Sequence, residues 1–389
     1  MGNTLDDLIP DFYVALDTVS RERIGMLTSV ARDARADRVA KNQIVRSFVT
    51  PYDADGGHDF TPSMSVPGAA DETIDNVPVQ ITKYRYWDFS WDGEEEYGLD
   101  NGGPGALSVR QGQIAQKIRA ALNEMEYDLC LAGQLGAARA WGDATATPFA
   151  TAGDYSAAAQ MQRLLDDCGA PDGDRSLVIN SLAAVNIVGL QAQAHMAGDV
   201  QLQRQGVLLD YAGFALRKSH FVVKHTAGTN NGAYDVNQPV TAPAAGDETI
   251  AFDTGTGTIL AGDIITNAES GRDSEKYVVA SALAAGSLKI AKPGLAIAWQ
   301  DGDTITGTAT YRANLAFHRN AIILANRLCK MPAKGDAALD STIITDPRTG
   351  ISFDLRYYGG IGMGVYRLYT AWGVKVLKPE HVHILIGKP

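Results

Sequence analysis

Between residues 109 and 132, apolar side chains recur three or four positions apart along the chain. Ser108 followed by Gln111 fits a capping box, in which each side chain bonds the backbone amide of the other. The repeated apolar positions are Ile114, Ile118, Leu122, Met125 and Leu129. Because these positions share one face of a helix, the pattern predicts a long amphipathic helix over residues 109–132.

The two segments before this helix differ from it and from each other. Apolar residues at helical spacing, interrupted by Pro10 and continuing to Ala34, predict an N-terminal helical arm over residues 1–47. Residues 48–104 are rich in Gly, Pro, Asp and Thr, with short β-like runs at 77–82 and 84–90. This stretch has too little apolar surface for its own core, so we interpret it as an extended β-hairpin loop.

Helix and strand patterns alternate after the long helix. They predict a helix near 157–165, a strand at 176–180 and a helix that opens at Ser181. A further helix is predicted at 314–328, and alternating residues predict strands at 351–356, 365–372 and 381–386. The prediction for the whole chain is therefore an α+β fold.

Helical periodicity is missing between residues 226 and 311. Short alternating runs occur at 249–252, 263–266, 276–279, 287–291 and 304–306, with turn residues between them. Two runs repeat one pattern, Gly-Asp followed by Ile-Ile-Thr from Gly262 and by Thr-Ile-Thr from Gly302. We interpret residues 226–311 as a small barrel or sandwich inserted into the α+β part.

The composition narrows the class of protein. A chain of 389 residues with 45% hydrophobic residues can bury two or three cores. No apolar run reaches the length that spans a bilayer and the start does not resemble a signal peptide, so we expect a soluble protein made in the cytosol, without membrane contact. Cys130, Cys168 and Cys329 lie far apart, so we expect reduced thiols, not disulfides or a zinc site.

The net charge of −11 is unevenly distributed. Twelve acidic residues and only two basic residues lie between positions 51 and 103. Seven basic and three acidic residues lie between positions 18 and 50. The overall charge argues against a dedicated nucleic-acid-binding protein, but a basic stretch directly precedes an acidic one.

The order of these segments resembles the coat proteins of tailed bacteriophages that share the Hong Kong-type capsid fold, in the subgroup with an inserted β-barrel. Residues 314–321, Asn-Leu-Ala-Phe-His-Arg-Asn-Ala, and residues 372–380, Trp-Gly-Val-Lys-Val-Leu-Lys-Pro-Glu, are similar to family sequence as well. The resemblance implies an N-terminal arm (1–47), an extended β-hairpin loop (48–104), and a spine helix with a peripheral domain (105–200). It further implies an axial domain (201–225 and 312–350), an inserted β-barrel (226–311) and returning C-terminal strands (351–389).

The resemblance also implies a function. Such a chain is a major capsid protein, without enzymatic activity or cofactor, that self-assembles as hexamers and pentamers into an icosahedral shell. The implied partners are a scaffolding protein, a portal protein and packaged double-stranded DNA, which is bound non-specifically. The implied location is the virion capsid, assembled in the host cytoplasm.

Candidate chemical motifs have simpler structural explanations. His381 and His383 lie two apart on a predicted strand and could share a metal, but no third ligand is evident. Asp53, Asp55 and Asp59 do not match the spacing of a calcium loop. The glycine-rich stretches at 255–257 and 360–364 lack the features of a phosphate loop and fit turns. We therefore predict no catalytic, cofactor-binding or metal-binding residue.

The candidate functional residues are those of a subunit interface. We expect the acidic run and its neighbouring aromatics to lie on a positive surface of another copy, and the arginines to contact an acidic partner or DNA. These residues are Arg21, Arg23, Arg32, Arg35, Trp87, Trp91, Glu94, Glu95 and Glu96. The alternative is that the acids form a solvated hairpin edge and the arginines a solvated helix face.

Two other functions remain open from the sequence alone. The chain could be another virion component, such as a tail or decoration protein. Less favoured is a hydrolase or lyase in which the β insertion is a binding module.

Overall fold

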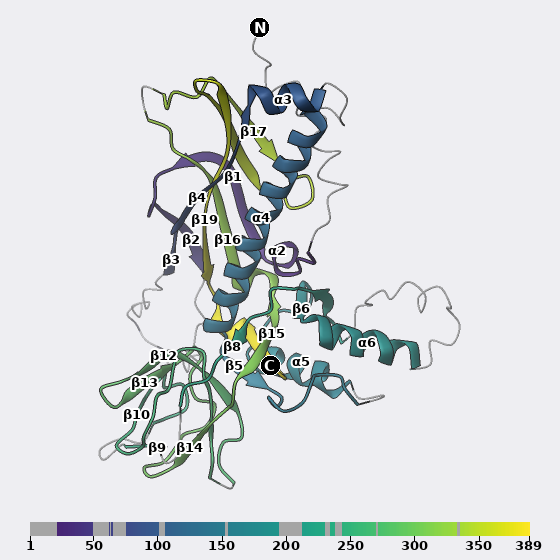
Figure 1. The fold of residues 1–389 in the computed structure, drawn as a ribbon. Coiled ribbons are helices and arrows are strands. Elements are labelled where there is room, and N and C mark those ends of the chain that lie inside the picture. Colours follow the sequence, from purple (N-terminus) through teal and green to yellow (C-terminus); the bar gives the residue numbers. More distant parts are fainter. Residues whose placement is uncertain are drawn as a thin grey trace.

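The computed structural model describes residues 22–49, 62, 64, 75–100, 106–151, 155–193, 212–229, 234–237, 243–269, 271–332 and 335–389. Figure 1 shows an elongated upper part, in which a long helix runs along a sheet, and a lower part of shorter helices and strands. One apolar core includes residues of both parts. The two parts are therefore packed together and do not form separate bodies.

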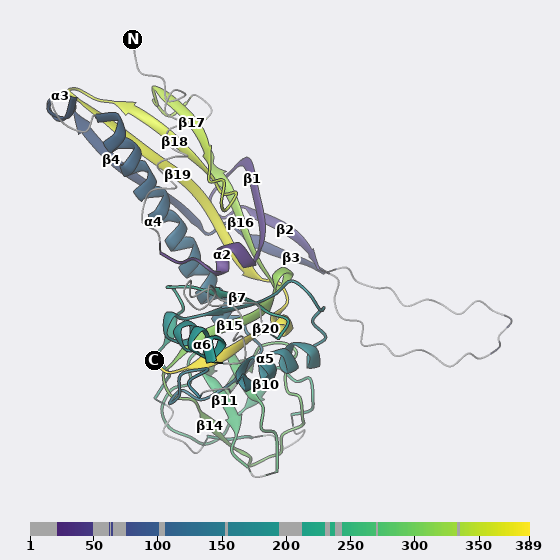
Figure 2. The same ribbon diagram turned by 90° about the vertical axis from the view of Figure 1, so that its right-hand side faces the viewer.

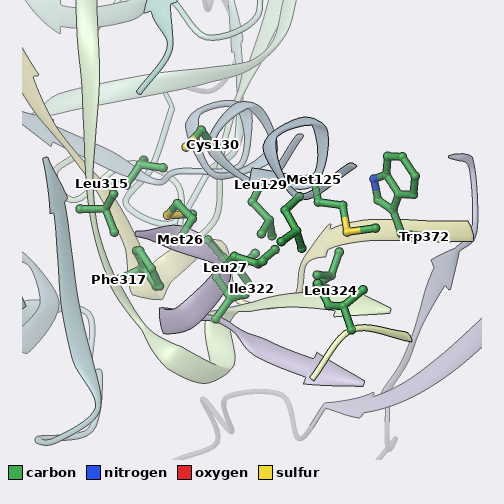
Figure 3. Packing of buried hydrophobic residues seen from close by; sticks show 14 of the residues in the cluster. Met26, Leu27, Met125, Leu129, Cys130, Leu315, Phe317, Ile322, Leu324 and Trp372 are labelled. Carbon is green, nitrogen blue, oxygen red and sulfur yellow. The ribbon is translucent and has the colours of Figure 1, made fainter. Parts of the chain in front are cut away.

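The predicted long helix is confirmed as α4 (Ala106–Leu135), which extends three residues beyond the predicted range at each end. Ser108 lies inside this helix, so it is not the N-terminal cap that its sequence context indicated. Figure 3 shows Met125 and Leu129 on the buried face of the helix, close to Ile322 and Leu324. The amphipathic stripe forms the centre of the main core because it faces strands along its length.

A six-stranded sheet lies along α4. Its strands are β1 (Ala31–Val39), β4 (Lys83–Asp92), β16 (Ile322–Cys329), β17 (Asp340–Thr345), β18 (Ser352–Gly359) and β19 (Met363–Val376). The order is β1-β16-β19-β18-β17, and β4 pairs along β19. The predicted strands at 351–356 and 365–372 are confirmed, and most of β19 alternates between buried and partly exposed residues.

The structure corrects the predicted helical arm. Residues 1–21 lie outside the described residues, and α2 (Met26–Ser29) is a single helical turn. The chain then continues as β1, which pairs in parallel with β16. Helical spacing up to Ala34 was misleading because a long-range strand pairing determines the conformation of these residues.

The predicted β-hairpin loop is present in part. The strands β2 (Ile44–Val49) and β3 (Asp75–Gln80) pair antiparallel, while residues 50–61, 63 and 65–74 lie outside the described residues. The second β-like run belongs to β4, which pairs with β19 instead of β3. The acidic run that follows is a helix, α3 (Gly93–Asp100), and not a hairpin edge.

The lower part contains a second sheet. Two helices, α5 (Ser156–Asp167) and α6 (Ser181–Gln193), pack on it through their own apolar cluster. The strands outside the insertion are β5 (Arg139–Trp141), β6 (Arg175–Ile179), β7 (Ala215–Lys218), β8 (Lys224–His225), β15 (Tyr311–His318) and β20 (Val382–Gly387). The predicted helices near 157–165 and from Ser181, and the predicted strands at 176–180 and 381–386, are confirmed.

The predicted helix at 314–328 is wrong. This segment consists of β15, the 3-10 turn η2 (Arg319–Ala321) and β16. Since β15 lies between β6 and β20 and nearly all of its residues are buried, it lacks the alternation that marks a half-exposed strand. The two strands belong to different sheets, so η2 divides the segment that was expected to lie in one domain.

The five short runs predicted between 249 and 306 are all strands. They are β10 (Thr249–Ala251), β11 (Ile264–Asn267), β12 (Lys276–Ala284), β13 (Ser287–Ile290) and β14 (Thr304–Gly307), joined by β9 (Tyr234–Asp235). These strands enclose a separate core that contains Tyr277 and Trp299. They are linked to the rest of the lower part because β12 pairs with β5.

None of the helices in the described ranges combines the length and the apolar character that a membrane crossing requires.

Candidate subunit interface

The outer end of the six-stranded sheet carries exposed apolar side chains. Figure 2 shows α3 beside the ends of β18 and β19, and the amide of Gly93 donates to the carbonyl oxygen of Gly362 at 3.4 Å. Around this contact, Leu339 is 72% exposed, Tyr97 is 72% exposed and Ile361 is fully exposed. We call Tyr97, Leu339, Ile361 and Met363 the apolar tip. Exposed apolar groups gathered at one end of a molecule are typical of a contact surface.

The acidic residues of α3 lie beside this tip. Glu94 and Glu95 are exposed, and the Glu95 carboxylate accepts a hydrogen bond from the backbone amide of Asp92 at 3.2 Å. Acidic side chains in the first turn of a helix are stabilised by its positive end. Glu96 belongs to the same helix, but its side chain lies outside the described part. Glu94 and Glu95 are therefore presented to solvent from a helix next to the apolar tip.

The two tryptophans make contacts within the chain. The ring of Trp87 stacks on Trp372, with centroids 6.2 Å apart, and Trp372 donates its indole N–H to Asp128 of α4. Trp91 is 6% exposed and donates to Gln113 of α4 at 2.7 Å. Trp87 thus packs β4 against β19, and Trp91 bonds β4 to α4. Little of the Trp91 side chain is left exposed to a partner. Because the two tryptophans are four residues apart on a strand, their side chains point to the same face. Two large rings on one face favour burial of that face.

The two candidate N-terminal arginines whose side chains the structure describes lie in different surroundings. Arg21 and the side chain of Arg35 lie outside the described part, and Arg23 is exposed. Arg32 is partly buried and donates to the carbonyl oxygen of Thr349. Since Arg32 and Arg35 lie on the strand β1, the interpretation of these arginines as a solvated helix face is wrong.

A buried carboxylate that the sequence reasoning missed holds the N-terminal segment. Glu126 of α4 is fully buried and accepts hydrogen bonds from the amides of Gly25, Met26 and Leu27 at 2.7–2.8 Å. The Ser219 hydroxyl donates to the same carboxylate at 2.7 Å. Burial raises the pKa of Glu126 above its ordinary value, while these hydrogen bonds act in the opposite direction. The sequence did contain a sign of this buried contact, because Glu126 is a single Glu on the buried side of the amphipathic helix.

A second contact with α4 lies earlier in the same segment. Arg119 donates to both carboxylate oxygens of Glu22, and Asn123 donates to one of them at 2.8 Å. The hydrogen bond from Arg119 is the main reason that the pKa of Glu22 falls to about 2. Together with Glu126, these residues fix the path of the chain into β1.

The two histidines considered as metal ligands are not arranged as a pair on one strand. His383 is fully buried, and this burial lowers its pKa to about 3. His381 lies in the turn η3 (Pro379–His381), so the two imidazoles do not share one strand face. No group of three or more possible metal ligands occurs in the described ranges. Cys130 and Cys329 are buried free thiols, Cys168 is partly buried and free, and Asp53, Asp55 and Asp59 lie outside the described residues.

The glycine-rich stretches are turns. Gly362 has a φ of 74°, in the left-handed region that favours glycine, and it connects β18 to β19. Gly255 and Gly257 have φ values of 115° and 106°, also positive, in the loop after β10. Neither stretch begins a helix, so neither has the amide arrangement that binds phosphate.

Comparisons with known proteins identify the fold. No family model and no curated protein matches the sequence. A chain of the capsid structure of cyanophage P-SCSP1u is 12% identical, with a TM-score of 0.52 over 95% of this chain and 89% of that chain. The mature capsid of bacteriophage PhiM1 is 9% identical, with a TM-score of 0.46 over 95% and 89%. The capsid of a native GTA particle is 9% identical, with a TM-score of 0.46 over 96% and 94%.

Identity this low shows a shared fold and no more. The likeness to the cyanophage capsid chain extends over nearly the whole of both chains. The chain therefore has the α+β Hong Kong-type capsid fold that the order of its segments predicted.

Proposed function

We propose that this chain is a major capsid protein, many copies of which form the icosahedral shell of a tailed phage. The observation that carries the proposal is the shared fold with the cyanophage capsid chain, which covers 95% of this chain and 89% of that one. The role is structural and requires no cofactor. The shell encloses double-stranded DNA, and assembly in the host cytoplasm involves a scaffolding protein and a portal protein.

In this proposal, residues 105–200 form the spine helix α4 and the peripheral domain, and residues 201–225 and 312–350 form the axial domain. Residues 226–311 form an inserted β-barrel. Support for the barrel comes from strand pairing in the order β9-β14-β11-β12-β13-β10. A bridge between Val236 and Phe252 then joins the segments of β9 and β10, so the pairing returns to its starting strand.

The apolar tip and the acidic residues of α3 make one of the contacts between copies. Subunit contacts commonly combine apolar side chains that lose water with a polar rim. Here Ile361 and Leu339 supply the apolar part, and Glu94 and Glu95 supply the rim. In the same proposal, the arginines Arg21, Arg23, Arg32 and Arg35 contact an acidic partner or packaged DNA, and Trp87 and Trp91 hold β4 in place.

Electron microscopy and sedimentation of the purified full-length chain, alone and co-expressed with its neighbouring gene products, test the proposal. We expect closed shells built mainly of this chain. Ile361→Asp should lower their yield, whereas Ile297→Asp, at a site 55% exposed on the insertion, should not.

Three outcomes would contradict the proposal. A chain that stays monomeric with every partner is not a shell protein. A few copies per virion would instead indicate a tail or decoration protein. Turnover of a substrate by the monomer would favour the hydrolase or lyase.

A further inference from the structure

A polar cleft of about 480 Å³ lies at one edge of the lower sheet. The parallel strands β6 and β7 both begin at this edge, and β15, which is antiparallel to β6, ends there. This topology places Ser176, Arg217 and Arg319 around one opening, although they come from separate parts of the chain. Thr28 of α2 also lines the cleft.

The cleft offers hydrogen-bond donors from several directions. Arg217 and Arg319 are exposed, while Ser176 is 6% exposed. Within the described ranges, the Arg319 side chain makes neither a hydrogen bond nor an ion pair. Asp174 is the one acidic residue among the described lining residues, so the guanidinium groups outnumber the carboxylates.

Arg175 also lines the cleft but has a different role. Its guanidinium is 3% exposed and is bound by Asp166 at 2.7 Å and Asp172 at 3.1 Å. It also donates to the carbonyl oxygens of Ala170 and Pro171. Because these partners compensate its charge, Arg175 has a structural role in the lining of the cleft. The uncompensated positive charge comes from Arg319.

Another guanidinium close to Arg319 adds to the positive field. Arg32 donates to the neutral carbonyl oxygen of Thr349. Burial, and then the charge of Arg319, lower the pKa of Arg32, and the charge of Asp346 acts in the opposite direction. An anion bound in the cleft at Arg319 would offset the repulsion between Arg319 and Arg32, which is not itself a lining residue.

We propose that this cleft binds a phosphate-class oxyanion held by Arg319, Arg217 and Ser176. Guanidinium groups form charge-assisted hydrogen bonds with phosphate oxygens, and a serine hydroxyl can donate a further bond. Donors from three chain segments that line one cleft suit a tetrahedral anion better than a planar carboxylate. The anion is either a free phosphate or a phosphate of a nucleic-acid backbone, and the site does not depend on the proposed shell function.

Isothermal titration calorimetry of the full-length soluble subunit tests this inference. The probes are inorganic phosphate, pyrophosphate and a short DNA duplex, each titrated at constant ionic strength. We expect saturable binding of at least one probe and about 10- to 100-fold weaker binding in Arg319→Gln and in Arg217→Gln. Lys289→Gln, which removes an exposed charge from the insertion, is the matched control and should bind like the wild type.

The pattern across the probes distinguishes the sources. Saturation by phosphate or pyrophosphate would identify a site for free anions, and saturation only by the duplex would identify a backbone phosphate; both support the inference. Absence of binding for all three of these probes would overturn the inference. A loss of affinity in Lys289→Gln as large as the loss in Arg319→Gln and Arg217→Gln would overturn it as well. An acidic peptide with the sequence of residues 91–100 is titrated as a fourth probe, and if it alone binds, the cleft is a protein contact and the inference is wrong. Thermal unfolding of each variant shows whether the fold is intact.

Discussion

Glu126 accepts a hydrogen bond from the backbone amide of Met26 at 2.8 Å, although 100 positions separate the two residues. The same carboxylate satisfies the amides of Gly25 and Leu27 and the hydroxyl of Ser219. A buried carboxylate is strongly disfavoured unless such donors surround it. One side chain of α4 thus determines where the N-terminal segment turns into β1.

We expect Glu126→Ala to lower the free energy of unfolding by about 3 kcal/mol, because three amides and a hydroxyl lose their buried acceptor. Glu124→Ala on the same helix is the control. Glu124 pairs with Lys83 and Arg85 at the surface, so its loss should cost about 1 kcal/mol or less. Urea unfolding of both variants measures the difference. Equal effects would show that the buried contact contributes no special stability.

Leu122 is 3% exposed on the buried face of α4. Leu122→Asp would place an unpaired charge in the main core, so we expect the soluble subunit not to accumulate. Leu182→Asp is the matched control, because Leu182 is 54% exposed near the start of α6. Soluble yield and circular dichroism after expression compare the two. Normal folding of Leu122→Asp would mean that this helix face is not essential.

The stability of the subunit should fall in acid because of His383. Its pKa of about 3 in the folded chain lies below the ordinary value of 6.5, so only the unfolded chain takes up this proton as the pH falls below 6.5. Stability is therefore lost between pH 6.5 and about 3, by up to about 1.4 kcal/mol per pH unit. His383→Leu should flatten this slope, whereas the exposed His220→Leu should not. Urea unfolding at a series of pH values provides the test.

The insertion should fold without the rest of the chain. Its strands enclose their own core, although β12 also pairs with β5 and His225 contacts Asp263 at 2.7 Å. A fragment of residues 226–311 lacks these two contacts but keeps the core. We expect dispersed amide signals in its NMR spectrum, and a random-coil spectrum would contradict this prediction.

Elements with one buried face were among the predictable parts of this fold. The stripe of α4 and the alternation in β19 each reflect one buried face, so local sequence was enough. By contrast, β15 is buried on both faces, and its apolar run was mistaken for a helix. In β1, pairing with β16 overrides a helical spacing, and the sequence carries no local sign of that distant partner.

The candidate interface was predictable to a smaller extent. Glu94 and Glu95 are exposed as expected. By contrast, Trp87, Phe89 and Trp91 alternate along β4, and this pattern already indicated a packed face. The apolar tip and the polar cleft combine residues from several distant segments. No motif marks either of them, since each depends on which strand ends meet.

The acidic residues of α3 allow the most direct test of assembly. Replacing Glu94, Glu95 and Glu96 together with lysine should leave the thermal stability of the subunit nearly unchanged. The described side chains in this run, Glu94 and Glu95, are exposed, and surface charges contribute at most about 1 kcal/mol each. The yield of closed shells should fall, because the reversed charge recurs at every copy of the contact beside the apolar tip.

Sedimentation of wild-type and triple-lysine protein under matched assembly conditions measures that yield. Asp253→Lys, at an exposed position on the insertion, controls for the effect of added positive charge on solubility. Because salt screens exposed charges, the defect should also shrink as ionic strength rises. Equal yields of closed particles at low salt would mean that these acids are only a solvated helix surface, and the contact between copies would then have to lie elsewhere on the subunit.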